Sequence, residues 1–79
     1  MYKIYELCGK SDYSIRFDKK IDIKKLKEYF KDFEIIDENE ETITLRKENK
    51  NIIGFSYGEI ILVNFNIEEV EKLAKYMES

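Results

Sequence analysis

Histidine, glutamine, proline and tryptophan are absent from the 79 residues, and cysteine occurs once, as Cys8. Without histidine, the chain lacks an imidazole base, the Ser-His-Asp and Cys-His nucleophile systems, and His-ligated zinc sites. One thiol forms neither an intrachain disulfide nor a cysteine-rich metal cluster, so we interpret Cys8 as a small buried hydrophobe. We therefore expect no cofactor, no metal site and no enzymatic activity.

Long apolar runs are also missing. The longest purely apolar run, Ile60 to Val63, is far short of the ~20 residues that a membrane-spanning helix needs. The opening Met1 to Glu6 lacks the apolar core of a signal peptide. Together with the single cysteine, these absences predict a cytoplasmic protein that does not bind a membrane.

Charged residues make up 39% of the chain, and the net charge is −3, which argues mildly against a dedicated nucleic-acid binder. Residues 16–31 are basic and residues 32–41 are acidic, which we interpret as two solvated faces. The acidic cluster could instead imitate a row of phosphates for a basic partner. Abundant lysine and glutamate suggest a thermophilic origin, although an AT-rich genome produces the same bias.

Apolar spacing predicts eight elements in one domain, residues 1–79. Strands are expected at residues 2–8, 13–18, 34–37, 42–47, 52–57 and 59–65. A helix is expected from Ile23 to about Asp32, with Asp22 as its N-cap. A last helix follows Asn66, where Glu69 completes a capping box. Its apolar stripe consists of Ile67, Val70, Leu73, Ala74 and Met77.

The order β-β-α-β-β-β-β-α with tight late turns predicts an α+β fold. We expect an antiparallel sheet with both helices on one face, which leaves the other face open.

Two motifs resemble ligand sites without their required context. Gly9-Lys10-Ser11 is similar to the end of a phosphate-binding loop, but a strand follows it where a helix is needed, so a plain turn is expected. Asp37, Asn39, Glu41 and Glu48 fit the spacing of a calcium-binding loop. That loop requires glycine at its sixth position, where Thr42 stands, and residues 42–47 alternate like a strand.

The strand at residues 59–65 is apolar on both faces, with Ile60 and Leu62 on one and Ile61 and Val63 on the other. Such a strand needs a cover over the open face, from the N-terminal strand region or from another subunit. Phe55 and Tyr57 share one face of the preceding strand. The alternation favours that face pointing toward the helices. The alternative places both rings on the open face, where they would mark a partner site.

From about Tyr13 to Met77, the order of elements resembles one repeat of the TATA-box-binding-protein fold. Phe55-Ser56-Tyr57-Gly58-Glu59 is similar to that family's Phe-x-x-Gly-Lys hairpin. The resemblance implies that Phe55 matches a phenylalanine that wedges between base pairs. Glu59 replaces the family's lysine, and Val63-Asn64 replaces its Thr-Gly. A single repeat would have to dimerise to build a DNA saddle.

These observations predict a non-enzymatic interaction module that binds a protein partner, or a second copy, through the helix-free sheet face. The candidate partner-binding residues are Arg46, Lys47, Phe55, Tyr57, Ile60 and Leu62. The alternative is a dimeric nucleic-acid binder with Phe55 exposed and Arg46, Lys47 or Lys50 on the same surface. A third reading is a small carboxylate- or lysine-based enzyme with a site at a dimer interface.

Overall fold

The computed structural model describes residues 1–7, 9 and 11–79, so the interpretation of Cys8 and part of the turn at Gly9 to Asp12 lie outside the described residues. The predicted α+β class and the order of elements are confirmed. The strands are β1 (Tyr2–Glu6), β2 (Asp12–Phe17), β3 (Glu34–Glu38), β4 (Thr42–Lys47), β5 (Lys50–Phe55) and β6 (Glu59–Val63). The helices are α1 (Ile23–Tyr29) and α2 (Ile67–Glu78).

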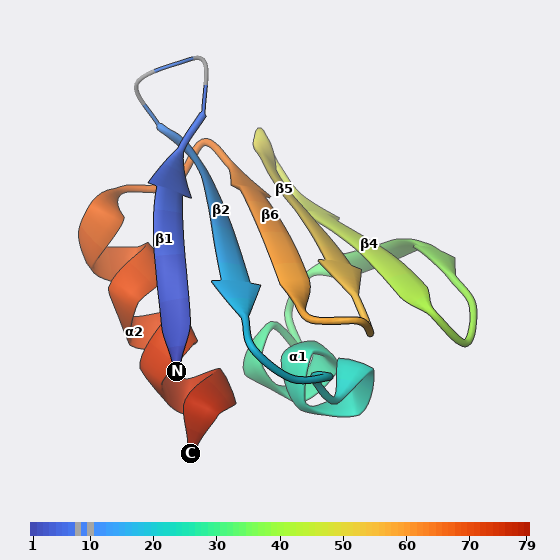
Figure 1. Cartoon of the computed structure of the whole chain (residues 1–79). Coiled ribbons are helices and arrows are strands. Elements are labelled where there is room, and N and C mark those ends of the chain that lie inside the picture. The colour runs from blue at the N-terminus through green and yellow to red at the C-terminus, as the bar shows by residue number, and fades with distance from the viewer. Residues whose placement is uncertain (8, 10) are drawn as a thin grey trace.

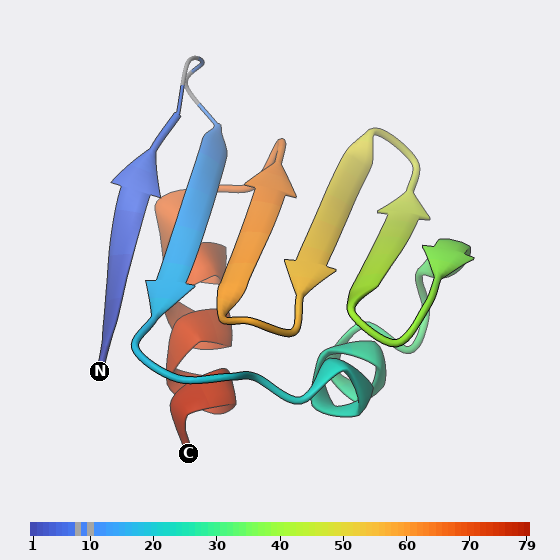
Figure 2. The same cartoon turned by 45° about the vertical axis from the view of Figure 1, so that its right-hand side comes forward.

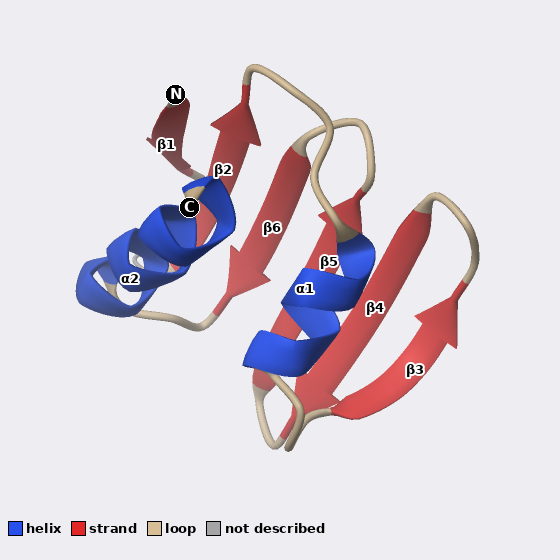
Figure 3. Ribbon diagram, turned by 90° about the horizontal axis from the view of Figure 1, so that it is seen from below, coloured by secondary structure: helices blue, strands red, loops and turns tan. Residues whose placement is uncertain are grey.

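All six strands form one sheet in the order β1-β2-β6-β5-β4-β3, and each neighbouring pair is antiparallel. Figure 2 shows β1 and β3 at opposite edges, with α2 behind the sheet. Seen from below, both helices lie over the same face (Figure 3). Helix α2 packs against β1 and β2, and α1 packs against β5. The fold is thus two layers thick, with Cα extents of 30 × 29 × 19 Å.

Local chemistry explains where the helices begin. The side chain of Asp22 accepts a hydrogen bond from the Lys24 N–H (3.0 Å) and caps α1. Asn66 and Glu69 form the predicted capping box of α2, because each side chain accepts a bond from the backbone of the other. Helix α1 is shorter than predicted and ends at Tyr29. The turn that follows brings Phe33 back against the Phe30 ring, 4.9 Å away between centroids.

Two residues with positive φ set strand ends that the sequence pattern misplaced. Glu48 (φ 57) turns the chain so tightly that Lys50 already pairs with Lys47, and β5 therefore begins before Ile52. Asn64 (φ 70) ends β6 at Val63 instead of Phe65. At Gly58 (φ 122), a Cβ atom would lie 2.6 Å from the Lys19 carbonyl oxygen, so this turn requires glycine.

The core lies between the helices and one face of the sheet (Figure 1). Alternate residues of β2 and β4 are buried in this core, namely Tyr13, Ile15, Phe17, Ile43 and Leu45. The predicted apolar stripe of α2 is confirmed from Val70 to Met77. Ile67 is an exception, because it lies at the start of α2 and is 40% exposed. Gly54 faces the core and lets α1 come close to β5, since a Cβ there would meet a methyl of Leu26 at 2.5 Å.

Candidate interaction surface

The face of the sheet without helices, called here the open face, is defined by strand register. Directly opposed residues of an antiparallel pair point to the same side. Ile53 pairs with Ile61 across β5 and β6, and their outer neighbours are Thr44 and Ser14. Phe55 and Val63 lie on the same side by alternation. Ile53, Phe55, Ile61 and Val63 are all partly exposed, and we call them the apolar band.

Helix-facing positions on the same strands are fully buried. Ile52, Ile60 and Leu62 are each 0% exposed, and they pack in the core. The prediction that Ile60 and Leu62 contact a partner is therefore wrong, because the helices already cover both side chains. Their neighbours Ile61 and Val63 carry the apolar surface that the two-sided strand pattern indicated.

Phe55 lies on the open face, so the favoured prediction that Phe55 and Tyr57 point to the helices is wrong. The reason is that Ile52 and the small Gly54 take the core positions of β5, and Phe55 must then point the other way. The Tyr57 ring stacks on Phe55 with centroids 5.3 Å apart. Tyr57 is 64% exposed, which makes it the most exposed aromatic residue of the described chain.

The two predicted basic residues of β4 lie on opposite faces. Arg46 is exposed on the open face, and its Nε donates to Oδ1 of Asn51 (2.9 Å). Lys47 alternates to the helix side, pairs with Asp32 and lies over the Phe33 ring. The hydrogen bond from Lys47 lowers the pKa of Asp32, and the same bond raises the pKa of Lys47. Lys47 is therefore not part of the open face, contrary to prediction.

No described segment covers the open face. Strand β1 pairs with β2 at the sheet edge, so of the two covers considered, the N-terminal strand is excluded. Figures 1 and 2 show the same arrangement, with β1 beside β2 in the plane of the sheet.

A hydrogen-bonded carboxylate lies beside the apolar band. Glu59 accepts from the Tyr57 hydroxyl (2.6 Å) and from the Ser14 hydroxyl (2.8 Å), and Arg16 Nε lies 3.6 Å from Glu59 Oε2. The bond from Tyr57 is the main cause that lowers the pKa of Glu59, and it raises the pKa of Tyr57. Ser14 is only 1% exposed. Alternation along β2 places Ser14 opposite the apolar face of that strand. This cluster was missed because β6 is apolar on both faces, so its pattern does not decide the face of Glu59.

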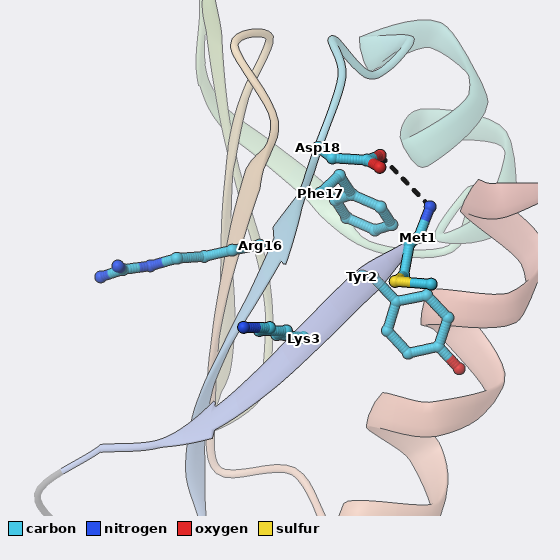
Figure 4. Close-up of a pocket in the computed structure, with 6 residues that line it drawn as sticks. All are labelled: Met1, Tyr2, Lys3, Arg16, Phe17 and Asp18. Carbon is cyan, nitrogen blue, oxygen red and sulfur yellow. Dashed lines mark hydrogen bonds and ion pairs between the residues drawn. The ribbon is translucent and has the colours of Figure 1, made fainter.

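A shallow pocket of about 230 Å³ lies at the β1–β2 edge (Figure 4). Lys3 and Arg16 point to one side of the sheet there, whereas Tyr2 and Phe17 point to the other. The Met1 ammonium binds Asp18 at 3.2 Å. The lining residues thus divide between two faces and do not converge on one reacting atom.

A second hollow, of about 290 Å³, lies on the helix side beneath Lys47 and Lys50. Both lysines are already paired, Lys47 with Asp32 and Lys50 with Glu69. Over residues 1–7, 9 and 11–79, no three acidic or cysteine side chains gather as a metal site would require. The residues of the calcium-like spacing are divided by β4, whose two ends carry the Asn39 and Glu48 turns. Among the described residues, neither helix is long and apolar enough to span a bilayer.

Comparison of the chain with protein-family models, with curated proteins and with solved structures gave no match. The resemblance to a TATA-box-binding-protein repeat therefore stays a prediction.

Proposed function

We propose that the protein is a small non-enzymatic interaction module, and that its open face binds a second copy of the chain. The observation that carries the proposal is the apolar band, Ile53, Phe55, Ile61 and Val63, on a sheet face that no described segment covers. Contiguous apolar surface on a soluble domain is typical of a protein-binding site. An exposed Tyr57 and an exposed Arg46 border the band, and Tyr and Arg are enriched at interfaces.

The hydrogen-bonded carboxylate of Glu59 favours binding to protein over binding to nucleic acid. Glu59 places a negative charge next to Phe55, where phosphates would be repelled. The register puts three basic side chains on the open face, Lys3, Arg16 and Arg46, against four acidic ones, Asp12, Glu34, Asp37 and Glu59. Lys47 and Lys50 lie on the helix side, so two of the lysines invoked for a nucleic-acid surface are not on it.

The stacked pair of Phe55 and Tyr57 is the one observation that favours the alternative, a dimeric nucleic-acid binder, because exposed aromatic rings stack on bases. That alternative requires salt-dependent binding of DNA or RNA, and no binding at low salt would remove it. No geometry in the described residues favours the enzyme hypothesis. The cytoplasmic location and the thermophilic origin stay predictions from composition.

Sedimentation velocity over a wide range of protein concentrations tests the proposal. We expect a reversible dimer, and we expect Ile61→Lys to be monomeric because a buried lysine would have no partner. Ile67→Lys is the matched control, since Ile67 is an exposed isoleucine on α2, away from the open face. Tyr57→Ala, a change at a highly exposed side chain, should weaken the dimer without unfolding the chain. A wild-type monomer at the highest concentration, or dimers of both Ile61→Lys and Tyr57→Ala with wild-type affinity, would contradict the proposal.

A further inference from the structure

The charges of the open face are separated between its two edges. On the β1–β2 side, Lys3 and Arg16 lie in one row of the register. On the β3 edge, Glu34 and Asp37 point to the open face, opposite Arg46 and Thr44 of β4. The turn that follows β3 adds Glu40 and Glu41, which are both exposed. The β1–β2 side of the face therefore has a net positive charge, with Lys3 and Arg16 against Asp12, and the β3 edge is acidic.

The apolar band lies between these edges. In the order β1-β2-β6-β5-β4-β3, three strands lie on each side of the line between β6 and β5. Ile61 and Ile53 face each other across that line. A two-fold axis that runs parallel to the strands along this line would place β6 of one copy over β5 of the other. It would likewise place β2 over β4 and β1 over β3.

We infer that a second copy packs face to face about this strand-parallel axis, so that the basic edge of each copy lies over the acidic edge of the other. The inference rests on the proposed function. The axis places Ile61 against Ile53 of the second copy at the centre of the interface. The same axis places Val63 against Asn51 and Phe55 against Glu59 of the second copy. Asp12 and Arg46 lie at the same level along the strands, on opposite sides of the axis. The axis therefore brings Asp12 of one copy toward Arg46 of the second copy. The opposite charges of the two edges then attract across the interface.

A two-fold axis that runs across the strands in the plane of the face is opposed by the acidic side chains of the β3 edge. It would place β3 of one copy over β3 of the other, with Asp37 facing Asp37 when the axis passes through the row of Ile53 and Ile61. Opposed like charges destabilise an interface and act against that arrangement. Face-to-face sheets pack with strand directions about 30° apart, and such a rotation keeps the edges of the strand-parallel dimer complementary.

The size of the face sets the expected affinity. Six strands spaced by ~4.8 Å and five residues of ~3.3 Å give a face of about 29 × 16 Å. Two such faces bury on the order of 1,000 Å² in total, which is the lower end for specific interfaces. We therefore expect a reversible dimer in the micromolar range or weaker, and we expect added salt to weaken it.

Charge reversal at the two edges tests the axis. Lys3→Glu and Asp37→Lys change exposed side chains that form no ion pair with another residue of the described ranges, 1–7, 9 and 11–79. Because each substitution alters two symmetry-related contacts, we expect each to weaken the dimer by about 5- to 30-fold at low salt. The double variant Lys3→Glu/Asp37→Lys should recover most of the wild-type affinity. Lys24→Glu, on the exposed side of α1, is the matched control and should leave the dimer unchanged.

The outcomes separate this inference from the proposed function. If Ile61→Lys abolishes the dimer and neither charge reversal weakens it, the open face is the interface but the axis is wrong. The same conclusion holds if both single reversals weaken the dimer and the double variant weakens it further. A wild-type monomer overturns both proposals.

Discussion

Replacement of Gly54 by alanine should destabilise the protein, although alanine is normally tolerated in a strand. The added methyl would lie 2.5 Å from Cδ2 of Leu26 and 3.3 Å from Cγ2 of Ile43. Leu26 and Ile43 are 0% exposed, so neither side chain can move out into solvent to avoid the new methyl. Overpacking of this kind costs about 1–3 kcal/mol. Alanine also restricts the unfolded chain, which stabilises the folded state by about 0.4–1 kcal/mol. We expect a net loss of about 1–2 kcal/mol.

Urea unfolding followed by circular dichroism measures this loss. The midpoint should fall while the slope stays constant, because the folded state remains equally compact. Leu26→Ala alone should cost about 2–5 kcal/mol through its cavity. In the double variant Gly54→Ala/Leu26→Ala, the new methyl has room. The loss of unfolding free energy measured for the double variant should therefore be about 0.5–3 kcal/mol smaller than the sum of the losses of the two single variants. A Gly54→Ala protein as stable as wild type, or strictly additive losses, would refute the close approach of α1 to β5.

Substitutions at three further positions test other parts of the structure. Gly58→Ala should lower the melting temperature by more than about 10 °C, because it adds backbone strain at φ 122 and a clash with the Lys19 carbonyl; an unchanged melting temperature would rule out this turn. Asn66→Ala should lower the unfolding free energy measured by urea unfolding by about 1 kcal/mol, because the N-cap of α2 is lost. Asn66→Ser should retain most of the wild-type unfolding free energy, because serine can also cap a helix. The folded-state pKa of Glu59 lies below the ordinary value of 4.5 for a glutamate. The contribution of Glu59 to the unfolding free energy is therefore present above pH 4.5 and is lost as the pH falls through the folded-state pKa. Melting curves from about pH 6 to pH 3 should therefore converge for wild type and Glu59→Gln, and a constant difference would contradict the network.

The elements of the fold were predictable because local signals agreed with packing. Asp22 and Asn66 cap the helices that follow them, and alternation in β2 and β4 placed their buried residues correctly. The strand ends were less predictable, because they depend on the positive φ of Glu48 and Asn64, residues that also occur in ordinary loops.

The face assignment of β5 and β6 could not be read from hydrophobicity, because both faces of these strands carry apolar residues. What decides it is that Gly54 must face α1, where no larger side chain fits beside Leu26. This one contact sends Ile60 and Leu62 into the core and Phe55 to the open face. The pattern of Ile61 and Val63 correctly indicated that the sheet has apolar residues on both sides. Whether the open face is covered depends on strand order, and β1 joins the edge of the sheet.

Amide chemical shifts on dilution test most directly whether the open face binds a second copy. The account predicts concentration-dependent shifts centred on Ile53, Phe55, Ile61 and Val63, with smaller shifts at the β1 and β3 edges and little change along the outer surface of α2. Shifts that concentrate on the helices, or spectra that do not change between dilute and concentrated protein, would contradict it.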